Sequence, residues 1–203
     1  MPTATFEHLP QQKKDRIIEA AIGEFAEYRF ADASINRIVK AAQIPRGSFY
    51  QYFSDKEDLY LLIMRKIGKE KLEVFARHPA PGENATFFEA AVASIPAVLD
   101  WLERYPKYNQ IAMHMAQDDS DFIRWIVGQL QDSQQSVLEA LRQDQGKGLI
   151  RKDVDLDLVL ELMMPLMSSL LHKYYQEGGQ RAALEKIEQA FDLIQNGLAE
   201  RGA

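Results

Sequence analysis

The chain has 203 residues, of which 46% are apolar and 27% are charged, and these values are those of an ordinary globular protein with one sizeable domain or two small ones. Neither a membrane-spanning segment nor a signal-peptide pattern appears in the sequence, and the lack of cysteine is compatible with a reducing compartment, so we expect a cytoplasmic protein. The net charge of −6 does not exclude an anionic partner, because the acidity lies in residues 78–203, at −8, whereas residues 1–77 carry 13 Lys and Arg against 11 Asp and Glu, a net of +2.

The first part of the chain predicts two amphipathic helices. One starts near Gln11, and apolar residues recur in it at helical spacing over residues 17–26. Ser34 then stands where the N-cap of a second helix is expected. Apolar residues at i, i+3, i+4 and i+7 follow it over residues 35–42, which gives this helix one apolar face.

The stretch IPRGSFYQYF, residues 44–53, predicts a third short helix. Pro45 fits its first position, because the fixed φ of proline suits a helix and its missing N–H costs nothing there. At about 100° per residue, Phe49 and Phe53 then face inward. The opposite surface and its borders are formed by Arg46, Gly47, Ser48, Tyr50, Gln51 and Tyr52. Only residues 43–44 separate this helix from the one before, which is typical of a helix-turn-helix, although a solvated amphipathic helix with an incidental glycine remains an alternative for this stretch alone.

A long fourth helix follows the third. The sequence SDKE at residues 54–57 predicts a capping box, and the helix should run to about Arg77, before the linker HPAPGEN. Lys56 would lie at the start of this helix, where a cation opposes the macrodipole. A nearby phosphate explains that placement, and a solvated lysine is the ordinary alternative.

Beyond the linker the chain reads as helical throughout and carries no catalytic, metal-binding or phosphate-loop signature. We expect helices over residues 85–104, 106–117, 120–144, 155–177 and 180–200. Aromatic residues and methionines are dense here, and although most must form a core, the same residue types line cavities for apolar ligands. The candidates for such a lining are Trp101, Tyr105, Met113, Trp125, Met163 and Met167. We interpret His114 and His172 as structural residues rather than as a metal ligand and a ligand anchor.

Two helices near the C-terminus indicate self-association. The segment over residues 156–175 is apolar on nearly all sides, so part of it must be covered by another surface. The last helix repeats apolar residues at intervals of three and four, and a pair of such helices from each of two chains makes a four-helix interface. We expect this interface to contain Leu166, Leu170, Tyr174, Phe191, Ile194 and Leu198.

Residues 17–63 resemble the DNA-binding domain of the TetR (tetracycline-repressor-like) family of bacterial transcriptional regulators. The resemblance rests on the opening I-x-E-A-A-x-x-x-F-A-E, on Phe30, Ser34 and Ile38, and on the block R-G-S-F-Y-x-Y-F-x-x-K-E. It implies an all-α protein of about nine helices, with a three-helix helix-turn-helix DNA-binding domain at residues 11–71 and a ligand-binding and dimerisation domain at residues 78–203. It also implies DNA contacts, chiefly to phosphates, by Ser34, Arg37, Arg46, Gly47, Ser48, Tyr50, Gln51, Tyr52 and Lys56.

Four positions depart from the family pattern, and two of them are Ala33 in place of a common threonine and Pro45 in place of a common serine or threonine cap. Arg29 stands where a glycine usually ends the first helix, and Gln43 where a glycine usually lies in the turn. Both glycines normally adopt a left-handed backbone conformation, which a non-glycine residue adopts at a cost of about 1 kcal/mol. The departures leave the expected fold unchanged but make the start of the recognition helix less certain.

These observations lead to the hypothesis of a non-enzymatic, cofactor-free repressor that binds a palindromic DNA operator as a homodimer and is released by a small, largely apolar effector. The resemblance implies that the effector shifts the helix over residues 55–77, which spreads the two recognition helices beyond the groove spacing of about 34 Å. Repression rather than activation rests on the resemblance alone. Two alternatives remain: a helix-turn-helix protein that acts only through protein partners, and an enzyme or carrier that uses the helical cavity.

Overall fold

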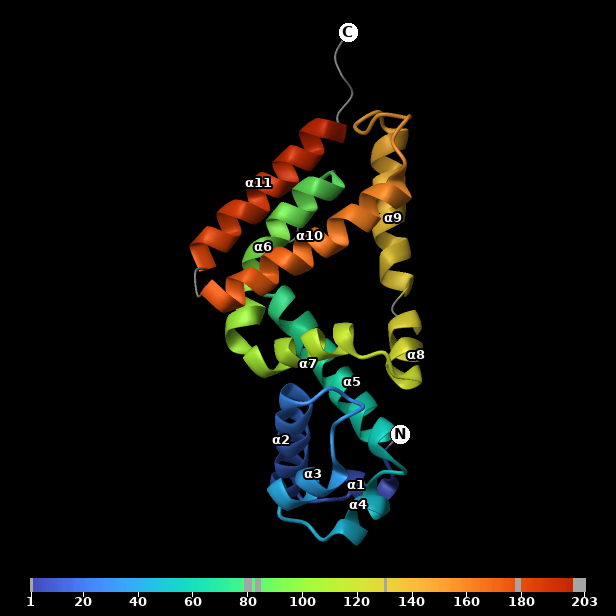
Figure 1. Ribbon diagram of the computed structural model, residues 1–203, viewed down its shortest axis with the longest axis vertical. Helices are drawn as coiled ribbons and strands as arrows, with labels where there is room; N and C mark the ends of the chain where they lie inside the picture. Colours follow the sequence, from blue (N-terminus) through green and yellow to red (C-terminus); the bar gives the residue numbers. More distant parts are fainter. Residues whose placement is uncertain (1, 79–81, 83–84, 130, 178–179, 199–203) are drawn as a thin grey trace. The chain divides into compact units, whose positions relative to one another are not determined.

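The computed structural model describes residues 2–78, 82, 85–129, 131–177 and 180–198, and the regular elements in these residues are all α-helices (Figure 1). They are α1 (Ala4–Glu7), α2 (Gln11–Glu27), α3 (Ile35–Ala41), α4 (Arg46–Tyr52), α5 (Lys56–Phe75), α6 (Phe87–Arg104), α7 (Pro106–Gln117), α8 (Asp121–Gln129), α9 (Gln131–Gly146), α10 (Leu156–Glu177) and α11 (Gln180–Leu198). The all-α fold class is confirmed. The short α1 is additional to the expected helices, and the helix expected over residues 120–144 is described as two, α8 and α9, on either side of residue 130.

The contacts of the chain divide it into two compact units. The first consists of Met1–Phe75 with Asp100–Gln129, and the second of Ala76–Leu99 with Leu130–Ala203. The expected C-terminal domain, residues 78–203, therefore contributes helices to both units. Its role in ligand binding and dimerisation stays a prediction.

The core of the first unit is built from the inward faces of α2, α3, α4 and α5. Phe25 of α2, Ile38 of α3, Phe49 of α4 and Ile63 of α5 are all buried, as their helical spacing predicts. α2 packs against α3 and α5, and α3 packs against α4. The tight α3–α4 connection and the burial of both helices on one side give the helix-turn-helix arrangement.

The turn between α3 and α4 has the left-handed conformation expected at Gln43, whose φ is 56°. Its backbone N–H donates to the carbonyl of Lys40, and the next N–H, of Ile44, donates to that of Val39, so the strained residue closes the end of α3. Arg29 does not adopt the left-handed conformation of the glycine that it replaces, because Gln43 is the one non-glycine residue with positive φ in the described residues. Instead, α2 ends in an extended Tyr28, and Arg29 pairs with Asp32.

The cap of α5 lies one residue later than the sequence pattern predicts. The helix begins at Lys56, and the carboxylate of Asp55, rather than the hydroxyl of Ser54, accepts the backbone N–H of Asp58 at 2.7 Å. The carboxylate of Asp58 in turn accepts the N–H and the hydroxyl of Ser54. The carboxylate of Asp55 therefore satisfies one N–H of the first turn of α5, and both carboxylates lie at the end of the helix that favours negative charge.

Helices α7 and α8 complete the first unit. α7 packs along α2, and Phe122 of α8 contacts the rings of Phe30 and Tyr60, with centroid separations of 4.5 and 5.9 Å. At the α7–α8 connection, Oδ2 of Asp118 accepts the backbone N–H of Ala31 at 2.9 Å. The loop that joins α2 to α3 is thereby held both by an aromatic cluster and by a buried carboxylate.

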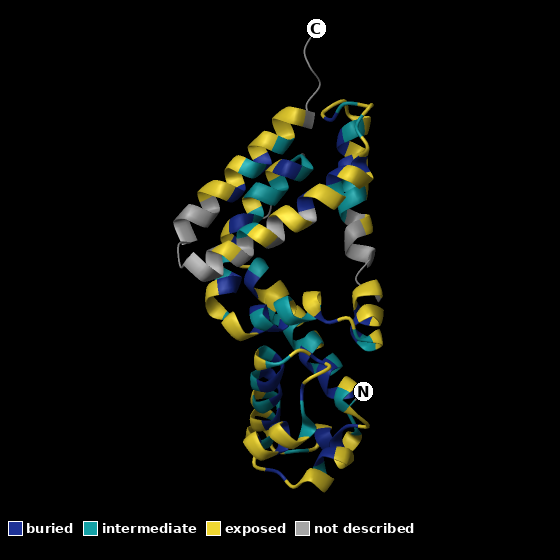
Figure 2. Ribbon diagram, in the orientation of Figure 1, coloured by how far each residue is buried: buried dark blue, intermediate teal, exposed yellow. Residues whose placement is uncertain are grey.

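The second unit has its own apolar core. Phe88 of α6, Leu141 of α9, Met163 of α10 and Phe191 of α11 belong to one buried cluster, and α10 packs against both α9 and α11. Figure 2 shows how buried and exposed residues alternate along these helices. None of the helices described is long and apolar enough to cross a membrane.

Candidate functional site

The outward face of α4 is polar and open to solvent. Arg46, Gly47, Tyr50 and Gln51 are exposed, and Ser48 is half-buried (Figure 2). Tyr50 is 52% exposed although its ring lies edge-on to the buried Phe49. The face therefore offers one cation, one phenol and an amide within two helical turns, and these groups suit contact with phosphates and base edges.

Gly47 leaves space on this face that the protein itself does not use. A Cβ at this position would meet no other atom within 4 Å, and the backbone has no left-handed conformation there. The fold therefore does not require glycine at position 47. A missing side chain at that point favours close approach by another surface, as the sequence predicts.

Tyr52 does not share the outward face, so its expected orientation is wrong. It is only 4% exposed, its ring centroid lies 6.3 Å from that of Phe6, and the ammonium group of Lys13 lies 5.4 Å from the ring centroid. The physical reason is helical spacing, because Tyr52 follows Phe49 by three residues and falls on the same inward side. A DNA contact by Tyr52 stays untested.

Ser34 and Arg37 at the start of α3 are both bonded to Glu24 of α2. Ser34 occupies the N-cap position, but its side chain makes no cap hydrogen bond, and its backbone N–H donates to Oε1 of Glu24 at 2.6 Å. The Nε of Arg37 lies 2.9 and 3.0 Å from the two oxygens of the same carboxylate. The guanidinium also lies 4.0 Å from the centroid of the Tyr28 ring. Arg37 is exposed at its outer edge, but its charge is engaged within the protein.

Lys56 likewise points into the protein. Its Nζ donates to the carbonyls of Phe30 and Ala33, at 2.6 and 2.8 Å, and to that of Ala31 at 3.4 Å. Burial lowers the pKa of Lys56, and the carboxylates of Asp118 and Asp32 act in the opposite direction. The three donors of the ammonium group are therefore directed at the loop between α2 and α3, which explains a cation at the start of α5 without any phosphate.

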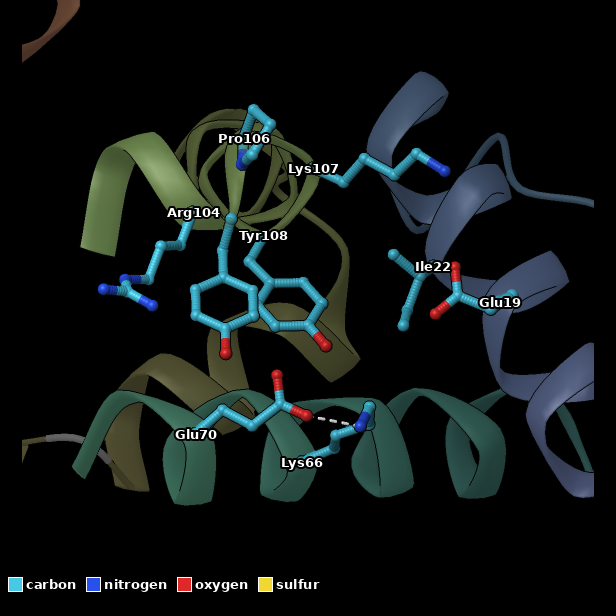
Figure 3. A pocket seen from close by; sticks show the side chains of 9 residues that line it. Glu19, Ile22, Lys66, Glu70, Arg104, Pro106, Lys107 and Tyr108 are labelled. Carbon is cyan, nitrogen blue, oxygen red and sulfur yellow. Dashed lines mark hydrogen bonds and ion pairs between the residues drawn. The ribbon is translucent and has the colours of Figure 1, made fainter. Parts of the chain in front are cut away.

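The first unit also holds a cavity of about 370 Å³ (Figure 3). Its walls come from α2, from α5, from the end of α6 and from the start of α7. The lining residues are Glu19, Ile22, Lys66, Glu70, Arg104, Tyr105, Pro106, Lys107 and Tyr108. Figure 3 shows Tyr108 above the ion pair of Lys66 and Glu70.

The aromatic wall of the cavity is formed by rings that pack against one another. The rings of Tyr105 and Tyr108 are parallel within 2° at a centroid separation of 5.0 Å, and Trp101 packs on Tyr105 at 4.6 Å. Burial and a hydrogen bond to Glu70 raise the pKa of Tyr108. Tyr108 therefore stays neutral and fixes Glu70, which already pairs with Lys66.

Of the residues predicted to line an effector cavity, Tyr105 lines this one and Trp101 supports it from behind. Met113 is half-buried, whereas Trp125 is 53% exposed and stacks on Phe122. Met163 belongs to the core of the second unit. The side chain of Met167 lies outside the described residues. The charged lining residues could not be found from the sequence, because they lie on helices that are far apart along the chain.

The predicted dimer residues differ in their exposure. Leu166 is exposed, Leu170 and Ile194 are half-buried, and Phe191 is buried against Phe88. The side chains of Tyr174 and Leu198 lie outside the described residues. Leu158 and Leu162, which precede Leu166 at intervals of four, and Leu193 are also exposed, and the sequence interpretation did not single them out. Their i, i+4, i+8 spacing on α10 is a signal that could have found them.

In the described part of the chain, no group of three or more His, Cys, Asp or Glu residues could hold a metal ion. His114 is half-buried, and its buried Nδ1 has no hydrogen-bond partner among the described residues. The side chain of His172 lies outside the described residues.

Comparisons with known proteins agree with this geometry. Residues 17–63 match the family model of bacterial regulatory proteins of the tetR family. The chain is 26% identical to the HTH-type transcriptional repressor AcnR of Corynebacterium diphtheriae over 98% of its own length and 97% of the relative, and 22% identical to AcnR of Corynebacterium glutamicum over 95% of both chains. It is similar to the crystal structure of a TetR family transcriptional regulator from Chloroflexus aurantiacus, with a TM-score of 0.77, 29% identity and coverage of 99% of this chain and 100% of that one. Residues 17–63 thus match the tetR family, and over nearly its whole length the chain is similar to a TetR family transcriptional regulator and to two transcriptional repressors.

Proposed function

We propose that the protein is a cytoplasmic transcriptional repressor, without enzymatic activity, that binds a palindromic operator and is released by a small effector. The observation that carries the proposal is the outward face of α4, where Arg46, Gly47, Tyr50 and Gln51 are exposed on a helix held rigidly by its buried aromatic side. The names of the two AcnR relatives, both transcriptional repressors, support repression as the consequence of binding.

Binding as a homodimer follows from the size of the reading surface. A recognition helix of seven residues contacts only a few base pairs, so specificity requires two helices in successive major grooves. The exposed leucines of α10, namely Leu158, Leu162 and Leu166, support an interface between two chains, since a row of large apolar side chains along one helix is unfavourable in water. We propose that α10 and α11 form this interface.

The cavity between α2, α5 and α7 is the site that we propose for the effector. Ile22, Pro106 and the two tyrosine rings offer apolar contact, and the charged lining consists of three cations, Lys66, Arg104 and Lys107, against the two acids Glu19 and Glu70. Lys66 pairs with Glu70 and Arg104 pairs with Asp100, so Lys107 is the cation of this lining that we propose to receive an anionic group. A largely apolar molecule with one anionic group fits this lining.

Release from DNA would follow from the position of this cavity. Its walls include α2, which packs against α3 of the helix-turn-helix, and α5, which follows the recognition helix directly. An effector that prefers a wider cavity shifts α2 relative to α5 and α7 and so changes the spacing of the two recognition helices in a dimer. The size of the response is limited by the difference in affinity of the effector for the two conformations.

Binding-site selection from random duplex DNA tests the DNA-reading role. The expected result is one enriched palindrome, and transcription in vitro from a promoter that contains this sequence should fall when the protein is added. The variant Arg46→Ala should enrich this palindrome poorly, whereas Lys152→Ala, in the second unit, should enrich it as wild type does. Absence of any enriched sequence would support the alternative in which the helix-turn-helix acts through protein partners.

The effector site is tested separately by tryptophan fluorescence. The chain has two tryptophans, so the variant Trp125→Phe leaves Trp101, which contacts Tyr105 of the cavity, as the only reporter. Titration with a panel of aliphatic and aromatic carboxylates should give a saturable change, and the corresponding neutral amides should bind more weakly. If amides and carboxylates bind with the same affinity, or if Lys107→Ala changes the affinity for neither class, the site assignment is wrong.

A further inference from the structure

The N-terminal segment of residues 3–7, which we call the N-terminal brace, lies against the end of the recognition helix (Figure 1). It consists of Thr3 and the short helix α1, and it precedes the part of the chain that matches the family model. This segment contacts α4 both through hydrogen bonds and through buried aromatic rings.

The hydrogen bonds of the brace satisfy the open end of α4. The last four carbonyls of any helix lack partners within that helix. Here the hydroxyl of Thr3 donates to the carbonyl of Gln51 at 2.6 Å, and the backbone N–H of Thr3 donates to that of Tyr52 at 2.9 Å. Thr3 also caps α1, since its side chain accepts the N–H of Phe6. Thr3 therefore satisfies two carbonyls at the C-terminal end of the recognition helix and also serves as the N-cap of α1.

The apolar contacts fix the brace in place. Phe6 is 3% exposed, and its ring centroid lies 4.9 Å from that of Phe53 and 6.3 Å from that of Tyr52. Lys14 of α2 holds the far end of the brace, because its Nζ donates to the carbonyl of Glu7 at 2.5 Å. The brace is thus attached both to the recognition helix and to α2.

We propose that the N-terminal brace is a positioning element that sets the orientation of the recognition helix and thereby its sequence specificity. The helix has only two turns, and a helix of that length is not stable by itself, so its position depends on what it packs against. Phe49 and Phe53 hold its inner side, and Thr3 and Phe6 hold its C-terminal end. The brace also contacts Tyr52, which its helical spacing places on the inner side of α4. This inference rests on the proposed DNA-reading function.

Specific and non-specific DNA affinity respond differently to such an element. Phosphate contacts tolerate small changes in orientation and supply most non-specific binding, whereas base contacts require defined geometry. Loosening the brace should therefore weaken binding to the selected palindrome and leave binding to a scrambled duplex nearly unchanged. A variant that merely unfolds part of the protein lowers both affinities together.

The test uses the full chain with Thr3→Val, which keeps the shape of the side chain and removes its hydroxyl, and with Phe6→Ala. The matched control is Thr5→Val, because Thr5 is exposed two residues further along. We expect the ratio of specific to non-specific affinity to fall by about fivefold for Thr3→Val and about tenfold or more for Phe6→Ala, and to be unchanged for the control. Amide hydrogen exchange over residues 46–53 should become faster in both variants, while residues 35–41 keep their protection.

The outcomes separate the two proposals. If wild type itself has no sequence preference, the proposed function fails. If wild type prefers the palindrome and both variants keep its ratio, the brace has no positioning role. A parallel loss of specific and non-specific affinity also overturns the inference. If Phe6→Ala does not fold, the ratio measured for Thr3→Val decides.

Discussion

Arg37 of α3 and Glu24 of α2 form a bidentate ion pair inside the DNA-binding unit. The Nη2 of Arg37 lies 2.6 Å from Oε1 of Glu24, and the side chain of Glu24 is only 6% exposed. The same carboxylate accepts the N–H of Ser34, so one buried acid holds the start of α3 in two places. The hydrogen bond to Glu24 raises the pKa of Arg37, which keeps its positive charge throughout the physiological range.

Replacement of Arg37 should therefore destabilise the folded protein itself, independently of any contact with DNA phosphates. We expect Arg37→Ala to lower the free energy of unfolding, because the buried carboxylate of Glu24 loses its charged partner. Arg37→Lys should recover only part of the loss, since an ammonium group cannot form the bidentate pair. Urea denaturation measures this, with Arg16→Ala of the exposed side of α2 as control. Unchanged stability with weakened DNA binding would instead assign Arg37 to the DNA backbone.

Gly47→Ala should change stability and DNA affinity in opposite directions. Alanine favours a helix over glycine, and a Cβ at position 47 meets nothing within 4 Å, so the free energy of unfolding should rise by about 0.5–1 kcal/mol. The same methyl group should obstruct close approach of DNA and weaken specific binding. Thermal unfolding and fluorescence anisotropy measure the two effects. Equal or tighter DNA binding by the variant would show that position 47 does not face the duplex.

Asp118 should make a contribution to stability that disappears in acid. Burial acts to raise the pKa of this carboxyl, but hydrogen bonds from Ser120 and from the N–H of Ala31 hold the pKa below its usual value of 3.8. A folded-state pKa below the unfolded value means that the stabilisation is complete above about pH 5 and is lost as the pH falls through the folded pKa.

The variant Asp118→Asn isolates this effect. The difference in unfolding free energy between wild type and Asp118→Asn should be constant from about pH 5 to 8 and should shrink below about pH 4. Urea denaturation across this range measures it. A difference that stays constant down to pH 3 would mean that the charge of Asp118 contributes nothing and that the loop between α2 and α3 is held by the aromatic cluster alone.

The exposed leucines of α10 predict the oligomeric state. Leu162 is 63% exposed, and in a dimer formed through this face an aspartate at position 162 would be buried without a partner. Leu162→Asp should therefore give a monomer of 23.2 kDa, whereas wild type and the neighbouring variant Glu161→Ala should have twice that mass. Sedimentation velocity distinguishes the two masses. A dimeric Leu162→Asp would place the interface elsewhere.

The helix-turn-helix could be predicted because the residues that determine it lie close together in the sequence. The spacing of buried residues in α2 and α3 and the left-handed residue Gln43 follow from the sequence and agree with the structure. Tyr52 was misplaced although its spacing from Phe49 carried the signal. The brace could not be predicted, since a helix of four residues has no periodicity and its partner, α4, lies more than forty residues away.

The site around the cavity was beyond sequence reasoning for a different reason. Tyr105 was predicted, but Glu19 and Lys66 come to the cavity from α2 and α5, and the packing of α2 against both α5 and α7 brings these residues together. The surface of α10 was partly predictable. Its apolar character was plain, but the burial of Phe191 on α11 and the exposure of Leu162 depend on how the two helices pack in the second unit.

The most direct test of the DNA-reading role is fluorescence anisotropy of the selected palindrome and of a scrambled duplex at several salt concentrations. We expect the palindrome to bind at least about 10³-fold more tightly, with two chains or a multiple of two per duplex. We also expect a steep decrease of affinity with salt, and a slope reduced by about 0.9 in Arg46→Ala if its guanidinium contacts one phosphate. Equal affinity for both duplexes at every salt concentration would contradict the assignment of α4 as a helix that reads DNA sequence.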